Sequence, residues 1–266
     1  RPLRVLVIAP KSMKKPWCAE VNEWWPGTST HEVSGSAAQR RKVIENGFGW
    51  PDAWTTSSVT VINWEAVRLH ARLAPYGSIA LKDDEKKPKE LNKSWDVVIV
   101  DEAHRLKDPK SKQTRGVWSV VHGAKVRFAM TGTPVANNLG DMWSIMHAVA
   151  PRETPGKTKF IDRYALTTFG AYGGIEIAGI QPGREAEFRK IFDHLMRRAP
   201  KLAVLPMLPP LVTSRRAVEM DKKQAALYRH MEDEAFALVE RGEGETTIIA
   251  SNPGVQTTRL MQFASS

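Results

Sequence analysis

Residues 97–104 read VVIVDEAH, four apolar residues followed by the adjacent carboxylates of Asp101 and Glu102 and then by His104. A short run of β-branched residues is typical of a strand buried on both faces of a parallel sheet. Open α/β sheets bind ligands at the carboxyl ends of their strands. An acidic pair at such an edge is costly unless a cation or a hydrogen-bond donor meets it. The segment therefore predicts an α/β fold with a functional acidic pair where this strand ends.

The two carboxylates suit different tasks in the hydrolysis of a nucleoside triphosphate. Magnesium prefers oxygen ligands and usually binds through one or two carboxylates together with water and phosphates. We therefore expect Asp101 to face a magnesium ion, through water. Glu102 is offset by one residue and can accept a proton from a water that attacks the terminal phosphate.

Apolar runs alternate with segments of helical period in the first half of the chain, the pattern of a mostly parallel sheet covered by helices. We expect four strands, each buried on both faces, at residues 5–9, 59–62, 97–100 and 126–130. A helix can open at Pro16, because proline fits the first turn of a helix. Four rings at apolar positions are expected in the core: Trp17, Trp24, Trp95 and Trp143.

The last of these strands leads into Thr131-Gly132-Thr133-Pro134. Alone, this sequence is a good turn, because glycine and proline set the backbone and threonine hydroxyls satisfy it. Hydroxyls at this edge of the sheet could also hydrogen-bond His104. The two polar strand ends together indicate a site more specifically than either one alone.

The composition favours a polyanionic partner. Thirty-nine lysines and arginines against 29 acidic residues give a formal charge of +10, which favours nucleic acid through counterion release. Ordinary solubilising charge is the alternative.

The single Cys18 and the lack of clustered Cys and His exclude an internal disulfide and a zinc site, and a reducing cytosolic compartment fits. No apolar run approaches the length of a membrane span.

The composition of the sequence changes near residue 150, where prolines and glycines begin to separate helical segments. We place a domain boundary there. We expect a long helix at residues 222–240, a loop at 241–253 and a solvated charged loop at 82–93. Pro155-Gly156-Lys157-Thr158 is interpreted as a surface loop rather than a phosphate-binding loop. Pro151 stands where the first glycine of such a loop would be, and no strand leads into it.

With these motifs in place, the chain resembles helicase superfamily two, and within it the Swi/Snf family of DNA translocases. Motif Ia of that family resembles Val5 to Ser12 with the following Trp17, Glu20, Trp24 and Pro26, and motif Ib resembles Val59 to Glu65. Motif II, the DEAH box, is Asp101 to His104 with the extension Arg105-Leu106-Lys107. Motif III is Thr131 to Asn138 running into Asp141-Met142-Trp143.

Later segments carry the same resemblance. Met196 to Lys201 and Leu205 to Pro210 are similar to the arginine pair and the Leu-Pro segment of the Swi/Snf protrusion, which RNA helicases of the DEAD-box class lack. Gln224 to Tyr228 and Thr258 to Gln262 resemble segments that precede the second motor lobe. The glycine-rich residues 172–180 are similar to the annealing-helicase branch.

The resemblance implies a fold and an activity. Residues 1–150 would form a RecA-like α/β motor lobe, and residues 151–266 a small helical protrusion with a strand near 212–219 returning to the lobe. The complete protein would use ATP and magnesium to move along double-stranded DNA, with Asp101, Glu102 and His104 as catalytic residues. Thr131, Gly132 and Thr133 would couple the nucleotide site to motion. Lys11, Ser12 and Asn63 would contact DNA phosphates, with Lys107 and Arg127 as further basic candidates.

The family's Walker A loop and second lobe are not found in this sequence, and the resemblance implies that the loop precedes Arg1 and the lobe follows Ser266. The isolated chain is therefore predicted to be inactive as an ATPase. Two other classes remain open: a non-catalytic DNA-binding or scaffolding fragment, and a helicase subunit of a restriction system or an RNA helicase. A motor of this kind would act in the cytoplasm, or in the nucleus of a eukaryote.

Overall fold

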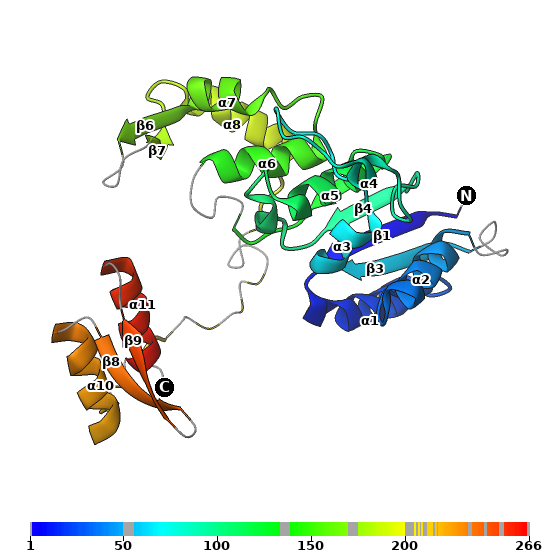
Figure 1. Ribbon diagram of the computed structural model, residues 1–266. Coiled ribbons are helices and arrows are strands. Elements are labelled where there is room, and N and C mark those ends of the chain that lie inside the picture. The colour runs from blue at the N-terminus through cyan, green and yellow to red at the C-terminus, as the bar shows by residue number, and fades with distance from the viewer. Residues whose placement is uncertain are drawn as a thin grey trace. The chain divides into compact units, whose positions relative to one another are not determined.

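The structure is a computed structural model that describes residues 2–49, 56–133, 139–169, 175–199, 205, 207, 209, 212–214, 216, 218–233, 236–241, 244–249 and 253–264. The chain divides into two compact units, Arg1–Arg198 and Ala199–Ser266 (Figure 1). Within the residues that the structure describes, no helix is long and apolar enough to cross a membrane.

A five-stranded sheet in the order β2-β3-β1-β4-β5 forms the centre of the first unit. Its strands are β1 (Arg4–Ala9), β2 (Ser29–Glu32), β3 (Ser58–Asn63), β4 (Val97–Val100) and β5 (Val126–Ala129). Every pairing in it is parallel. The four predicted strands are all present, which confirms the α/β fold class.

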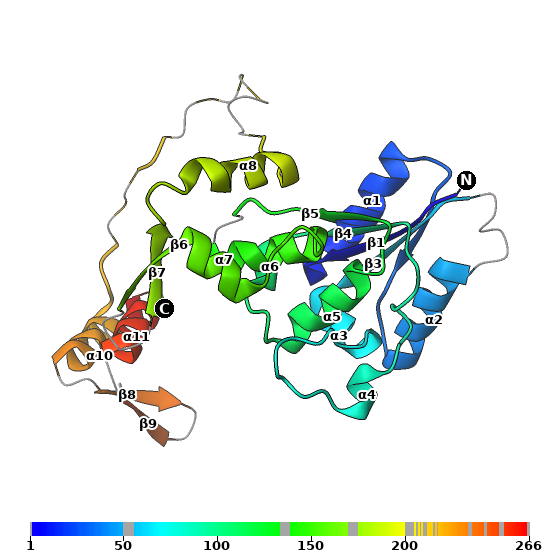
Figure 2. The same ribbon diagram turned by 90° about the horizontal axis from the view of Figure 1, so that it is seen from above.

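Helices cover both faces of this sheet (Figures 1 and 2). The connecting elements are η1 (Lys11–Met13), α1 (Lys14–Trp24), α2 (Ala37–Gly49), α3 (Trp64–His70), α4 (Asp83–Lys86), η2 (Ala103–Leu106) and α5 (Lys112–Val121). Helix α1 packs on the face that carries Val5 and Val7, whereas α2, α3 and α5 contribute to the larger cluster that contains Leu6 and Ile8. Residues 82–93, predicted to be a loop, include the single turn α4.

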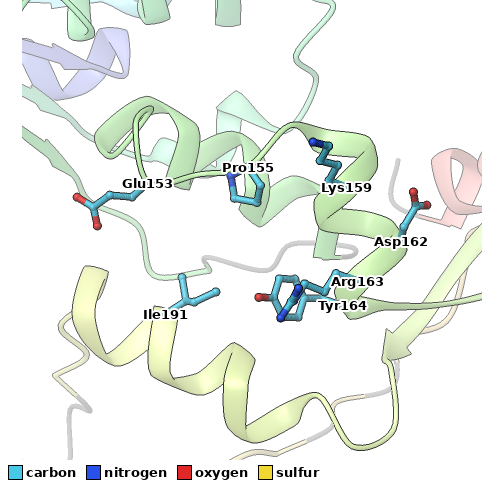
Figure 3. A pocket seen from close by; sticks show the side chains of 7 residues that line it. All are labelled: Glu153, Pro155, Lys159, Asp162, Arg163, Tyr164 and Ile191. Atoms are coloured by element: carbon cyan, nitrogen blue, oxygen red, sulfur yellow. The ribbon is translucent and has the colours of Figure 1, made fainter.

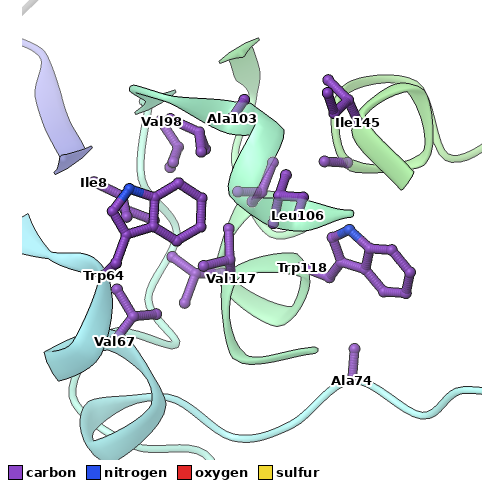
Figure 4. Close-up of a cluster of buried hydrophobic side chains, with 14 of the residues drawn as sticks. Ile8, Trp64, Val67, Ala74, Val98, Ala103, Leu106, Val117, Trp118 and Ile145 are labelled. Carbon is purple, nitrogen blue, oxygen red and sulfur yellow. The ribbon is translucent and has the colours of Figure 1, made fainter. Parts of the chain in front are cut away.

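The larger cluster is the main core of the protein. Figure 4 shows the indoles of Trp64 and Trp118 in it together with Ile8, Val98 and Leu106. Trp95 and Trp143 are buried as predicted, with 0% and 2% of their surface exposed. The prediction was wrong for Trp24, which lies in the last turn of α1 and is 76% exposed. Trp17 is only half-buried, at the edge of the smaller cluster.

Strand β5 differs from the prediction that all strands are buried on both faces. Val126 pairs with Val97, and Phe128 pairs with Ile99, so these side chains share the face of the sheet that α1 covers over β1 and β3. Val126 and Phe128 are nevertheless 46% and 53% exposed. The reason is that β5 is the last strand in the sheet order and no described helix packs over its half of that face.

The chain beyond residue 150 continues the first unit. After β5, this unit contains α6 (Leu139–Val149), α7 (Lys157–Tyr164), β6 (Ala165–Phe169), β7 (Ile175–Ile180) and α8 (Glu185–Leu195). Phe160, Tyr164 and Phe188 belong to the main cluster, so the compact unit ends at Arg198 rather than near residue 150. The protrusion is not purely helical, because β6 and β7 form an antiparallel hairpin. The predicted division into a lobe and a protrusion stays a prediction.

The second unit differs from three predictions. It contains α10 (Lys222–Asp233), β8 (Phe236–Arg241), β9 (Gly244–Ile249) and α11 (Pro253–Ala264). The predicted helix at 222–240 ends at Asp233, and the predicted loop at 241–253 contains β9. Antiparallel pairing of β8 with β9, in which Thr246 to Ile249 are all β-branched, overrides the helix propensity predicted for residues 236–240. The described residues of 212–219 are exposed and form no strand, so the predicted returning strand is not found there.

Lys14, at the start of α1, ties this helix to the loop after β2. Its side chain is buried, and its Nζ donates to the Val33 carbonyl oxygen at 2.7 Å and to Ser34 Oγ at 2.5 Å. It also pairs with Glu32 Oε1 at 3.1 Å. The start of α1, and with it the η1 turn, is therefore fixed by a buried cation.

We predict that Lys14→Met lowers the free energy of unfolding by about 2 kcal/mol, because it leaves buried acceptors without a donor. The matched change Lys15→Met, at the exposed neighbouring position, should cost less than about 0.5 kcal/mol. Urea denaturation of both variants measures the difference. Equal losses in the two variants would show that the buried cation does not hold the helix.

Candidate active site

The parallel register brings the predicted site residues to one edge of the sheet. Ala9 at the end of β1 pairs with Asn63 at the end of β3, and Val100 at the end of β4 pairs with Ala129 at the end of β5. The polar segments that follow these strands therefore start at the same edge. They are the η1 turn with Lys11 and Ser12, Asn63, Asp101 to His104, and Thr131 to Thr133.

Asp101 is held by donors on several sides. Its backbone N–H donates to the Ile8 carbonyl oxygen at 2.8 Å. Its Oδ1 accepts the Glu102 N–H at 2.9 Å, and its Oδ2 accepts the Trp17 indole N–H at 3.0 Å. Its carbonyl oxygen accepts the Trp64 indole N–H at 3.1 Å. Backbone and side chain of Asp101 are thus both fixed, while the residue remains half-buried.

Glu102 has left-handed backbone angles, φ 52° and ψ 48°, which among the described non-glycine residues it alone adopts. A non-glycine residue in this region stores strain and is held there by its surroundings. The turn brings Glu102 Oε2 to 3.2 Å from His104 Nδ1 and leaves its side chain 47% exposed. The carboxylate is therefore oriented by a neighbour and open to water.

His104 also connects motif II to motif III. Its Nδ1 lies 3.3 Å from Thr131 Oγ1, so the predicted contact between His104 and a hydroxyl at this edge is confirmed. Thr131 Oγ1 in turn accepts the Thr133 N–H at 3.1 Å. The Ala103 N–H donates to the Met130 carbonyl oxygen at 2.9 Å. Residues 134–138, which include the rest of motif III, lie outside the described residues.

A second polar network joins motif Ib to motif II. Asn63 Nδ2 donates to Glu65 Oε2 at 2.8 Å, and Arg105 Nη2 donates to Glu65 Oε1 at 2.8 Å. The hydrogen bond from Asn63, aided by Arg105 against the opposing effect of burial, lowers the pKa of Glu65 to about 2. The Arg105 guanidinium also lies 5.4 Å from the ring centroid of Trp64. Glu65 therefore stays ionised and keeps these turns together near neutral pH.

The candidate DNA contacts separate into two groups. Lys11, Ser12 and Lys107 are exposed, and Asn63 lies at the same edge. Arg127 is different, because its guanidinium donates to the carbonyl oxygens of Val121, His122 and Val149, near the carboxyl ends of α5 and α6. Its side chain thus caps helices, and the structure does not bring it to the strand ends.

Magnesium fits Asp101 as a water-mediated partner rather than as part of a protein cage. Within the described residues, no group of three or more His, Cys, Asp or Glu side chains could hold a metal ion. Each carboxylate oxygen of Asp101 accepts one hydrogen bond from the residues above, and such an oxygen can accept two. The remaining lone pairs can face the water shell of an ion, which is how Mg²⁺ commonly binds beside phosphates.

Pro155 and Gly156 are exposed and lie in a loop as the sequence predicted, whereas Lys157 and Thr158 begin a helix. Gly156 caps α7, which begins at Lys157, and the preceding regular element is the helix α6. Lys157 Nζ lies 6.0 Å from the ring centroid of Trp143, and burial lowers the pKa of Lys157. No strand leads into this turn, so it lacks the strand–loop–helix setting of a phosphate-binding loop.

A groove of about 640 Å³ lies beside α7 and α8, lined by Glu153, Pro155, Lys159, Asp162, Arg163, Tyr164 and Ile191 (Figure 3). None of the predicted site residues lines it. Arg163 and the Tyr164 hydroxyl both contact Glu187 Oε1, at 2.6 and 2.8 Å. These contacts link α7 to α8, which gives Arg163 and Tyr164 a structural role.

Sequence reasoning missed the side chains that orient Asp101. The apolar stripe places Trp17 in the core, and that pattern does not predict its bond, or that of Trp64, to Asp101. The role of Glu65 in joining Asn63 to Arg105 is likewise not predicted. An indole N–H within a motif that borders a carboxylate strand end is a signal for such a contact, because indole is a donor without an acceptor.

A parallel sheet covered by helices, with Asp-Glu-Ala-His after one strand and Thr-Gly-Thr after the next, defines a RecA-like lobe of the helicase type of ATPase. The chain belongs to the SNF2-related domain family, which it matches over residues 3–264.

Relatives come from several branches of this family. The chain is 28% identical over 233 residues to the helicase swr-1 of Neurospora crassa, covering 85% of this chain and 11% of that protein. It is 27% identical over 229 residues to Protein CHROMATIN REMODELING 4 of Arabidopsis thaliana, covering 85% and 9%. It is 26% identical over 214 residues to the DNA annealing helicase and endonuclease ZRANB3 of Bos taurus, covering 79% and 18%. Because identities are similar across branches, the likeness to the annealing branch stays a prediction.

The fold is also that of a solved structure, the SWI2/SNF2 ATPase core of Sulfolobus solfataricus in complex with dsDNA. The TM-score is 0.53 at 19% sequence identity, with 98% of this chain and 47% of that chain covered. The chain therefore spans about half of that ATPase core and a fifth or less of the three relatives above.

Proposed function

We propose that the complete protein hydrolyses ATP and uses the energy to move along double-stranded DNA, with this chain supplying most of its first motor lobe. The main support for the proposal is the group of polar residues that follows strands β4 and β5. Asp101, the strained Glu102 and His104 lie where an ATPase needs a metal-facing carboxylate and a base, beside the motif III hydroxyl of Thr131. Membership of the SNF2-related domain family supports the same activity.

Each residue has a separate role in this proposal. Asp101, oriented by its hydrogen-bond donors, would hold the water shell of a magnesium ion. When bound with ATP, this ion would neutralise charge on the phosphates. Glu102 accepts the proton of the attacking water, because its carboxylate is half-exposed and oriented by His104. Hydrolysis changes the phosphates beside motif II. The contact between His104 in motif II and Thr131 in motif III would pass this change on to the segment that follows β5.

The phosphate-binding strand and helix would dock on the open half of the sheet. Val97, Ile99, Val126 and Phe128 form an apolar face there, and β5 has a free edge among the described strands. The crossing from β1 through α1 to β2 places its helix on the same face. A strand that comes before β1 in the sequence and pairs with the free edge of β5 would connect to β1 in the same direction across the sheet. A right-handed connection would therefore place its helix on the face that carries these residues.

The proposed DNA path follows the same edge of the sheet. Lys11 and Ser12 are exposed in the η1 turn, and Asn63 ends the neighbouring strand β3, so they can contact successive phosphates of one strand. Lys107 is a further exposed candidate, and the formal charge of +10 favours a polyanionic partner such as DNA.

The second motor lobe would complete the ATP site. The protein would act in the cytoplasm or, in a eukaryote, in the nucleus.

We predict that Glu102→Gln in the complete protein lowers the DNA-stimulated ATPase rate by about a hundredfold or more, because general-base assistance typically contributes 10² to 10⁴. ATP binding should persist, since the change keeps the side chain's size. Steady-state hydrolysis with saturating duplex DNA measures the first effect, and equilibrium binding of labelled ATP the second. Glu185→Gln, at an exposed position in α8, is the matched control and should leave both unchanged. An unchanged rate in Glu102→Gln would exclude Glu102 as the base.

A second prediction concerns the DNA path. Lys11→Ala combined with Asn63→Ala should weaken binding of the complete protein to duplexes of unrelated sequence by a similar factor. It should also lower the salt slope of log Kd by about 1, because each neutralised phosphate contributes about 0.9. Lys86→Ala, an equally exposed lysine on α4, should change neither. Binding measured across a series of salt concentrations tests this, and a loss limited to one sequence would instead indicate base recognition.

A further inference from the structure

Two tryptophans from the predicted DNA-contacting motifs donate to the same acidic residue. Trp17 lies in α1, which directly follows the η1 turn that carries Lys11, and its Nε1 donates to Asp101 Oδ2 at 3.0 Å. Trp64 opens α3 directly after Asn63, and its Nε1 donates to the Asp101 carbonyl oxygen at 3.1 Å. Asp101 is therefore joined to both of these motifs.

Packing alone does not require the bond from Trp17. The ring lies at the edge of the small cluster formed by Val5, Val7 and their neighbours, and both Trp17 and Asp101 are half-buried. Water could satisfy the indole N–H at such a position. Trp64 is different, because it is fully buried and its N–H needs a protein acceptor. The contact from Trp17 to the side-chain oxygen is thus the informative one.

The contact fixes the direction of the carboxylate. Oδ1 is held by the backbone N–H of Glu102 and Oδ2 by Trp17, so rotation of the carboxyl group would break one bond or the other. Hydrogen bonds of this kind orient a metal-facing carboxylate, and their loss typically costs 10- to 100-fold in metal affinity or activity. The donor on Oδ2 moves with α1, whose start is anchored by the buried Lys14.

We infer that Trp17 is a positioning residue that links the DNA-contacting η1 turn to the metal-facing carboxylate of Asp101. The inference rests on the proposed function. When a DNA phosphate fixes the η1 turn and α1, the Trp17 N–H holds Asp101 Oδ2 in the direction that receives the hydrated magnesium ion. Without that donor, the Glu102 N–H alone holds the carboxylate, which can then rotate more easily, and DNA binding no longer favours the productive arrangement.

The test uses Trp17→Phe in the complete protein, which keeps an apolar ring and removes the donor. The first measurement is the affinity for a fluorescent ADP with magnesium and with EDTA. We expect the ratio of the two affinities to fall about tenfold, with the EDTA value unchanged. The second is the ratio of ATPase rates with and without duplex DNA, which should fall by a similar factor while the Kd for DNA stays as in the wild type.

Trp24→Phe is the matched control. Trp24 lies in the same helix and its Nε1 also donates to a carboxylate, that of Glu20, at 2.8 Å, but it is exposed and does not contact Asp101. This variant should leave both ratios unchanged. Wild-type ratios in Trp17→Phe, or equal changes in the two variants, would overturn the inference.

Two further variants separate the possible causes. Trp17→3-benzothienylalanine replaces the ring N–H by sulfur at nearly constant shape, so it tests the donor even if Trp17→Phe fails to fold. In an Asp101→Asn background the loss of the Trp17 donor should have no further effect on the magnesium ratio, because the two act on one carboxylate. An additive effect would mean that Trp17 acts elsewhere. No DNA-stimulated ATP hydrolysis by the wild-type complete protein would reject the proposed function itself, whereas normal ratios in Trp17→Phe beside an active wild type would reject only this inference.

Discussion

The parallel register of β1, β3, β4 and β5 is the constraint on which the rest of this structure depends. Because these strands run in the same direction and pair without a shift, their carboxyl ends meet at one edge of the sheet. The segments that follow them are separated by long stretches of sequence, yet they all start at that edge. A slip of one residue would turn Asp101 to the opposite face, and the bond from Trp17 would be lost.

Helices cover the two faces of the same sheet to different extents. On one face α2, α3 and α5 cover a continuous core, whereas on the other α1 packs over the half of the sheet that holds β1, β3 and β2. The exposed Val126 and Phe128 are apolar residues that a parallel sheet normally buries. An open apolar half-face beside the acidic strand end is where a phosphate-binding strand and helix would complete both the fold and the active site.

Much of the fold and the centre of the site could be predicted from the sequence, because both depend on local patterns. Short runs of β-branched or other apolar residues predicted the four strands, and the polar residues after them predicted the edge of the sheet that carries Glu102. Long-range effects escaped prediction. Residues 236–240 include the good helix formers Ala237, Leu238 and Glu240, yet they form strand β8 by pairing with β9. Arg127 donates to helix carbonyl oxygens because of a packing geometry that composition does not reveal. The exposure of Trp24 likewise depends on where α1 ends relative to the sheet.

The central claim is that the acidic strand end after β4 is the ATP site of a DNA motor. The most direct measurement is an experimental structure of the complete protein with magnesium and a non-hydrolysable ATP analogue. The account predicts the terminal phosphate at the carboxyl edge of the sheet, with Asp101 facing the hydrated ion and Glu102 facing the position of the attacking water. A nucleotide bound elsewhere, for example against Lys157 or in the groove lined by Glu153 and Arg163, would contradict it.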